Sequence, residues 1–118
     1  MAGDLMPQTD IEDELIRLSR LLDQATRKIL QRALASAKAD SLYKREFAKA
    51  LLMVDGGSVQ VKEAKAITAP GVWELYDQRK IKEAVLQSAV EAARNLRAQL
   101  EAMRSINTNQ RFFLERAS

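Results

Sequence analysis

Apolar positions near the N-terminus recur at alternating steps of four and three residues, the spacing of one helical face. The pattern runs from Ile11 to Ile29 and forms a heptad seam of a and d positions. A stripe this narrow is typical of a helix that packs on a partner helix rather than into a broad core. We therefore predict a helix whose seam forms an oligomer interface, built from Ile11, Leu15, Leu18, Leu22 and Ile29.

The first helix is predicted over residues 9–54, after a loose tail over residues 1–8. Thr9 fits an N-cap, and Glu12 three positions later completes a capping box. The apolar period loses its regularity after Ile29 and resumes at Tyr43. Periodicity leaves open whether this stretch is one helix or two, with a break near residues 40–41.

Two interruptions follow the first helix. Residues 55–58 combine an aspartate, paired glycines and a serine that can cap a short helix over 58–67. Pro70 and Gly71 end that helix. A long last helix is predicted over 71–104, followed by a break at 105–109 and a short turn over 109–116.

These elements predict an all-α fold with residues 9–118 in a single domain. Two long helices joined by a short helical elbow fold back as a long antiparallel hairpin. A lone hairpin leaves its apolar stripes half covered, so we expect a homo-oligomer that associates through coiled-coil-like seams.

The amino-acid composition excludes several kinds of catalytic and metal-binding site. The chain has no cysteine and no histidine, which removes disulfides, thiolate nucleophiles, imidazole bases and nearly every zinc or haem ligand set. No glycine-rich phosphate loop or nucleophile elbow is present. We expect neither catalysis, nor a metal site, nor a cofactor. The N-terminus does not resemble a signal peptide, and no apolar run is long enough to span a membrane, so a cytoplasmic protein is expected.

Charge is segregated along the chain although the net charge is only +3. Residues 1–23 carry six acids and two bases, whereas residues 24–52 carry seven bases and two acids. A local positive field attracts phosphates whatever the total charge. The alternative is that these charges simply solvate exposed helices.

The strongest candidate site is a basic run on the helix before the glycines, with two lysines beyond them. Phosphate binding needs several cations on one surface, and a tyrosine ring can stack on a base. The predicted nucleic-acid-binding residues are Tyr43, Lys44, Arg45, Lys49, Lys62 and Lys65. For Tyr43, a place in the core is the competing interpretation, because its spacing matches the apolar stripe.

Other charged and aromatic residues receive structural interpretations. Glu63 is expected to pair with Arg45 or Lys49 across the elbow. A later basic group is a weaker nucleic-acid candidate, with solvated surface as the default interpretation. Trp73 is expected to anchor the start of the last helix. That later group consists of Arg79, Lys80 and Lys82, with Arg94, Arg97 and Arg104 further along.

The stretch from Tyr43 to Thr68, a basic helix, a glycine turn and a short E-x-K helix, resembles the UvsY-type recombination mediators of T4-like bacteriophages. The resemblance extends over roughly residues 25–115. It implies an oligomer that binds single-stranded DNA and helps to load a RecA-like recombinase onto strands coated by single-strand-binding protein. It also implies strand binding by Lys44, Arg45 and Lys49, and a bacterial host if the chain is phage-encoded.

Two functional hypotheses follow. The first is a single-stranded DNA-binding mediator of phage recombination or replication, with the recombinase or the single-strand-binding protein as a partner. The second is a helical interaction or scaffold protein, such as an assembly chaperone or structural subunit, without nucleic-acid binding. The heptad seam favours both equally. The choice between DNA and RNA, the number of subunits and the role of the acidic N-terminus stay open.

Overall fold

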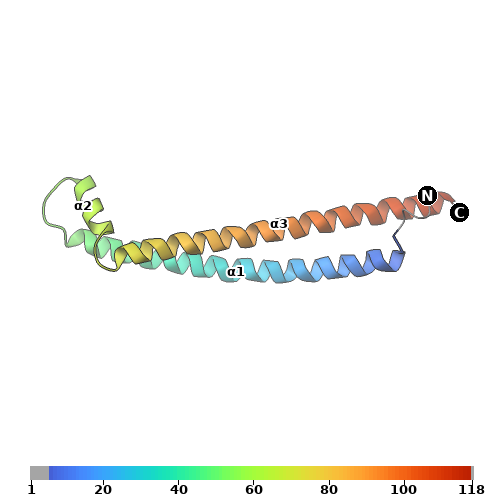
Figure 1. Ribbon diagram of the computed structural model, residues 1–118, viewed down its shortest axis with the longest axis horizontal. Helices are drawn as coiled ribbons and strands as arrows, with labels where there is room; N and C mark the ends of the chain where they lie inside the picture. The colour runs from blue at the N-terminus through green and yellow to red at the C-terminus, as the bar shows by residue number, and fades with distance from the viewer. Residues whose placement is uncertain (1–5, 118) are drawn as a thin grey trace. The chain divides into compact units, whose positions relative to one another are not determined.

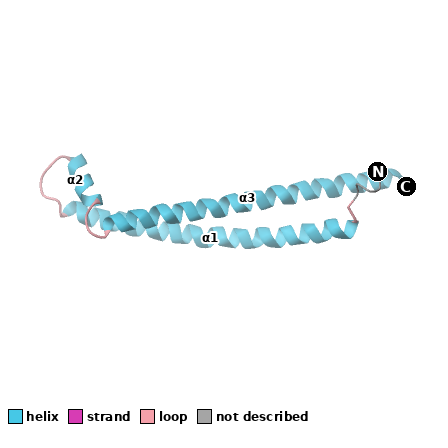
Figure 2. Ribbon diagram, in the orientation of Figure 1, coloured by secondary structure: helices cyan, strands magenta, loops and turns pink. Residues whose placement is uncertain are grey.

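The computed structural model describes residues 6–117, which form three helices. Helix α1 spans Gln8–Leu52, α2 spans Val59–Ile67 and α3 spans Val72–Ala117 (Figure 1). Within this described range there is no strand (Figure 2). The predicted all-α fold, in which two long helices pack on each other around a short helical elbow, is confirmed.

Helix α1 is one uninterrupted helix, without the break considered at residues 40–41. It begins one residue earlier than predicted, because the carbonyl of Pro7 accepts hydrogen bonds from the amides of Asp10 (3.0 Å) and Ile11 (3.2 Å). Thr9 therefore lies inside the helix, and the predicted capping box at Thr9 is wrong. Part of the predicted tail, residues 1–5, lies outside the described residues.

The elbow follows the sequence signals closely. Gly56 and Gly57 have φ values of +69° and +97°, a left-handed conformation that side chains with a Cβ rarely adopt. The hydroxyl of Ser58 then caps α2 by accepting from the amide of Val61 at 3.3 Å. Gly71, at φ +85°, completes the turn into α3. The predicted stops at 55–58 and 70–71 are confirmed.

The predicted break at 105–109 is wrong, since α3 continues through it to Ala117. Helix propensity is weak for serine and asparagine, but tertiary contacts override it here. The side-chain oxygen of Asn107 accepts a hydrogen bond from Gln8 Nε2 at 2.9 Å. Gln110 is buried, and its side chain bonds both the amide (3.1 Å) and the carbonyl (2.7 Å) of Met6.

The chain divides into two compact units. The terminal unit combines the chain up to Lys28 with the chain from Val90 onward, and the elbow unit is Ile29–Ala89. In each unit a stretch of α1 lies antiparallel to a stretch of α3 (Figure 1). Buried apolar residues of the terminal unit are Ile11, Leu18, Ala25, Ala93 and Leu100; those of the elbow unit are Tyr43, Ala66 and Val72.

Two of the five positions of the predicted oligomer seam are buried within a single chain. Ile11 and Leu18 are 0% and 1% exposed, so no surface remains on them for a second copy. Leu15, Leu22 and Ile29 are half-buried. The assignment of Ile11 and Leu18 to an oligomer interface is therefore corrected: α3 supplies the partner helix that the narrow stripe requires.

Replacement of Leu18 by alanine is expected to lower the free energy of unfolding by about 2–5 kcal/mol, because it opens a cavity in the terminal unit. The matched control is Ile16→Ala on the same helix, where the side chain is 50% exposed and the expected change is within about 0.5 kcal/mol. Urea denaturation followed by helical circular dichroism measures both. Equal losses in the two variants would contradict this assignment of the core.

Candidate functional site

The predicted basic cluster before the elbow is divided by ion pairs. Lys44 Nζ lies 2.9 Å from Asp40 Oδ2. Asp40 Oδ1 is also 2.8 Å from Nε of Arg79, in an ion pair rather than a hydrogen bond, and Arg79 Nε lies 3.3 Å from Glu83. The hydrogen bond from Lys44 lowers the pKa of Asp40, with smaller contributions from the charges of Lys44 and Arg79. Lys44 is thus partly neutralised by a neighbour.

Tyr43 belongs to the core of the elbow unit. Its ring is 8% exposed and lies 5.8 Å from the ring of Phe47 and 5.7 Å from that of Tyr76, between centroids. The guanidinium of Arg79 lies over it at 5.1 Å. The ring has no free face on which a base can stack. The predicted stacking role of Tyr43 is corrected in favour of the competing interpretation.

A different set of cations gathers in a groove between α1 and α3 of the elbow unit. Its volume is about 580 Å³, and no carboxylate lines it. Lys38 and Arg45 come from one face of α1, and Lys82 reaches the groove from α3. We call this the basic groove; its lining is Ala35, Lys38, Ala39, Ser41, Leu42, Arg45 and Lys82.

The cations of the basic groove are largely uncompensated. Within residues 6–117, neither Lys38 nor Lys82 forms an ion pair. The acidic contact of Arg45 is its chain neighbour Glu46, at 3.8 Å. Alanines and Leu42 supply the apolar part of the lining. The groove therefore offers three cations to an anion together with an apolar surface.

The remaining predicted residues lie outside the lining of this groove. Lys49 Nζ is 3.3 Å from Glu46. Lys62 is half-buried and Lys65 exposed on α2, and neither is ion-paired in the described chain. The expected pairing of Glu63 with Arg45 or Lys49 is absent from the described contacts. Arg45 is thus the one predicted residue that lines the groove.

Sequence reasoning missed Lys38 and placed Lys82 in a weaker candidate group whose default interpretation was solvated surface. A signal for Lys38 existed, since Lys38, Leu42 and Arg45 are spaced by four and three residues and share a helix face. The place of Lys82 in the same groove as Lys38 could not be predicted, because it depends on how α3 packs against α1 in the elbow unit.

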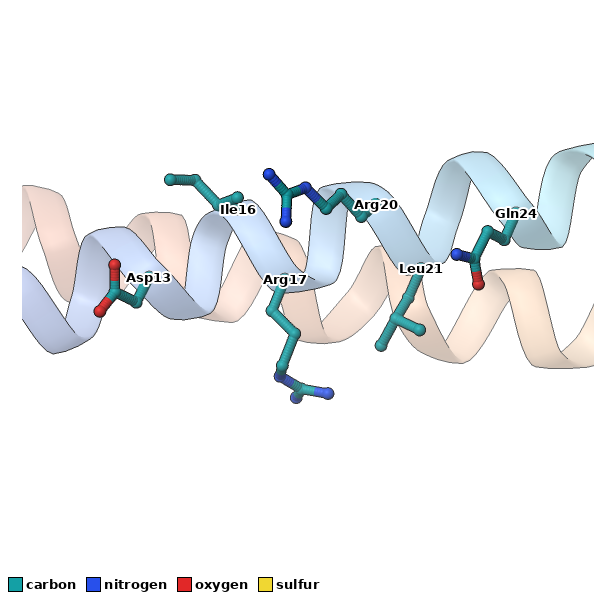
Figure 3. A pocket seen from close by; sticks show the side chains of 6 residues that line it. All are labelled: Asp13, Ile16, Arg17, Arg20, Leu21 and Gln24. Carbon is teal, nitrogen blue, oxygen red and sulfur yellow. The ribbon is translucent and has the colours of Figure 1, made fainter.

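Two hollows in the terminal unit have mixed charge. One, of about 550 Å³, lies along α1 and is lined by Asp13, Ile16, Arg17, Arg20, Leu21 and Gln24 (Figure 3). Arg17 Nε donates to Glu14 at 3.0 Å and lowers the pKa of that carboxyl. The other hollow, of about 300 Å³, includes Asp23 beside Arg20 and Arg104. An acidic side chain in each hollow makes it a poorer phosphate site than the basic groove.

No known protein family matches the chain, and no curated protein or solved structure matches it. Residues 6–117 contain no group of three or more metal-ligating side chains. In the same range, none of the helices has the length and apolar character of a membrane span.

The ion pairs of Asp40 predict a pH-dependent stability. Because the folded state favours the charged carboxyl, its contribution is complete above the unfolded pKa of about 3.9 and is lost as pH falls through the lowered folded pKa. Asp40→Asn is expected to be less stable than wild type at neutral pH, with the difference vanishing in acid. Urea denaturation over a pH series measures it.

Asp77→Asn provides the control for Asp40→Asn, since Asp77 forms no ion pair among the described residues. Its difference from wild type is expected to be small at every pH. A constant difference between Asp40→Asn and wild type from neutral to acid pH would rule out the electrostatic role of Asp40.

Proposed function

We propose that this protein binds single-stranded DNA and that the basic groove holds the phosphate backbone. The observation that carries the proposal is the convergence of Lys38, Arg45 and Lys82 on one groove that no carboxylate lines. The lysine and arginine side chains there replace counterions condensed on the strand, and the release of these counterions is the main source of affinity in sequence-tolerant binding.

The lining of the groove also suits a single strand. Lys38 and Arg45 lie at the two ends of the α1 side of the groove, and Lys82 lies on its α3 side. Cations spread in this way can contact successive phosphates of a strand rather than one isolated anion. The apolar side chain of Leu42 lies between Lys38 and Arg45 along the helix, where sugars or bases can pack. The affinity is therefore expected to depend on phosphate number and salt more than on base sequence.

A mediator role in phage recombination, with a homo-oligomeric protein and a RecA-like recombinase or single-strand-binding protein as partner, extends this proposal. It is supported by the sequence resemblance of residues 25–115 to UvsY-type mediators. Strand binding by the basic groove is the part that the geometry supports. The extension is tested by asking whether the protein speeds recombinase loading on coated single strands.

A triple variant, Lys38→Glu, Arg45→Glu and Lys82→Glu, is expected to weaken binding to a labelled oligothymidine by roughly tenfold or more at low salt. Loss of three phosphate contacts also lowers the slope of log affinity against log salt by about 2, since each contact on a single strand contributes about 0.7. Fluorescence anisotropy over a salt series measures both quantities.

The matched control is a second triple variant with the same change in charge outside the groove. It carries Arg94→Glu, Arg97→Glu and Arg104→Glu on α3. It is expected to keep most of the affinity and the salt slope of wild type. Equal losses in the two triple variants would show that net charge, not the basic groove, binds the strand. No binding by wild type at low salt would reject the proposal.

A protein-binding scaffold is the second candidate function, and one observation favours it. Near its C-terminal end α3 exposes three consecutive large apolar side chains, Phe112, Phe113 and Leu114. Contiguous exposed apolar surface often marks a protein interface. Wild type that forms a defined oligomer or complex through this segment, yet retains no oligonucleotide, would support the scaffold function.

A further inference from the structure

The only tryptophan of the chain, expected to anchor the start of the last helix, is half exposed. Trp73 lies in the first turn of α3 and is 49% exposed. Its ring stacks on Tyr76, with 5.4 Å between centroids and 20° between planes. The ring of Trp73 therefore presents an exposed apolar surface, and its stacking on Tyr76 fixes the orientation of that surface.

The stack continues into the core. Tyr76 meets Tyr43 edge-on at 5.7 Å and 65°, and Tyr43 is buried. The three rings form an aromatic ladder that leads from the interior of the elbow unit, through Tyr76, to the exposed indole of Trp73. Because Tyr76 covers one face of that indole, its exposure is concentrated on the opposite face and the edges. The ring is thus positioned before any ligand arrives.

A cation accompanies the ladder. Lys80 Nζ lies over the ring of Tyr76 at 5.6 Å, and its acidic contact is Glu83 at 3.8 Å. Trp73, Tyr76 and Lys80 are spaced by three and four residues and share one face of α3. The open ring of Trp73, with the ammonium group of Lys80 about two helical turns away, matches a planar base in a strand that carries phosphates.

We propose that Trp73 is a stacking platform for an unpaired nucleobase of the strand whose phosphates occupy the basic groove. The inference rests on the proposed function and adds a reason for single-strand preference, because the bases of a duplex are already stacked on each other and present no free face. Stacking on an aromatic ring tolerates any base sequence.

The two contacts lie on different sides of α3. Trp73 and Lys82 are nine residues apart, which is two and a half helical turns and about 14 Å along the axis. A strand that touches both must therefore pass around α3. Very short oligonucleotides reach one contact, and the affinity rises when the strand becomes long enough to reach both.

Because Trp73 is the sole tryptophan, its fluorescence reports directly on the platform. The probes are oligothymidine, oligouridine and an abasic DNA strand with the same number of phosphates, each titrated into the 118-residue protein. Quenching by both base-containing strands, and none by the abasic strand, is expected. A duplex of the same length is expected to quench weakly.

Affinity provides the second readout. Trp73→Ala is expected to weaken binding of oligothymidine by about 5- to 150-fold and to leave binding of the abasic strand unchanged. Trp73→Phe keeps an aromatic ring and is expected to recover much of the loss. Circular dichroism of both variants checks that the helices persist, and the quenching of wild type tests the platform without any substitution.

The failures of the two proposals are distinguishable. Equal affinity of wild type for oligothymidine and the abasic strand, without quenching, would overturn the platform while the basic groove stands. The platform is likewise overturned if Trp73→Ala weakens binding of both strands equally. If neither strand binds wild type at low salt, the proposed function itself is rejected and the platform is rejected with it.

Discussion

The packing of α1 on α3 is the interaction on which the other features of each unit depend. Neither long helix can bury a narrow apolar stripe by itself, and a helix of this length is held chiefly by what covers that stripe. In the terminal unit α3 covers Ile11 and Leu18, and in the elbow unit it brings Tyr76 against Tyr43. The same contact decides which charged side chains meet and which remain free.

In the elbow unit, this packing places acids and bases unevenly around the two helices. Asp40 forms ion pairs with Lys44 and Arg79, and Glu83 also pairs with Arg79. The positive charges of Lys44 and Arg79 are therefore largely balanced. Lys38, Arg45 and Lys82 line the basic groove without a carboxylate among its lining residues. Although the net charge of the chain is only +3, the basic groove attracts anions more strongly than that net charge suggests.

Much of the fold could be predicted because it depends on local chemistry. The paired glycines need a left-handed backbone, Ser58 supplies a cap, and helical periodicity marks α1 wherever packing is regular. The two errors have different causes. Residues 105–109 stay helical because Asn107 accepts a hydrogen bond from Gln8, a tertiary contact that local propensity does not contain. The cap of α1 was misplaced because the carbonyl of Pro7 accepts backbone hydrogen bonds from Asp10 and Ile11, so the helix begins one residue earlier than predicted.

The sequence by itself determined that the chain forms helices, that they are interrupted at residues 55–58 and 70–71, and which stretches carry an excess of positive charge. These features depend on neighbours within about one turn. Only the tertiary structure decided that Tyr43 is covered, that Trp73 is half exposed, and that Lys82 rather than Lys44 shares a groove with Arg45. The physical reason is that helical spacing fixes the faces of one helix. The rotation and register of a second helix against it decide which acids neutralise which bases and which rings are buried.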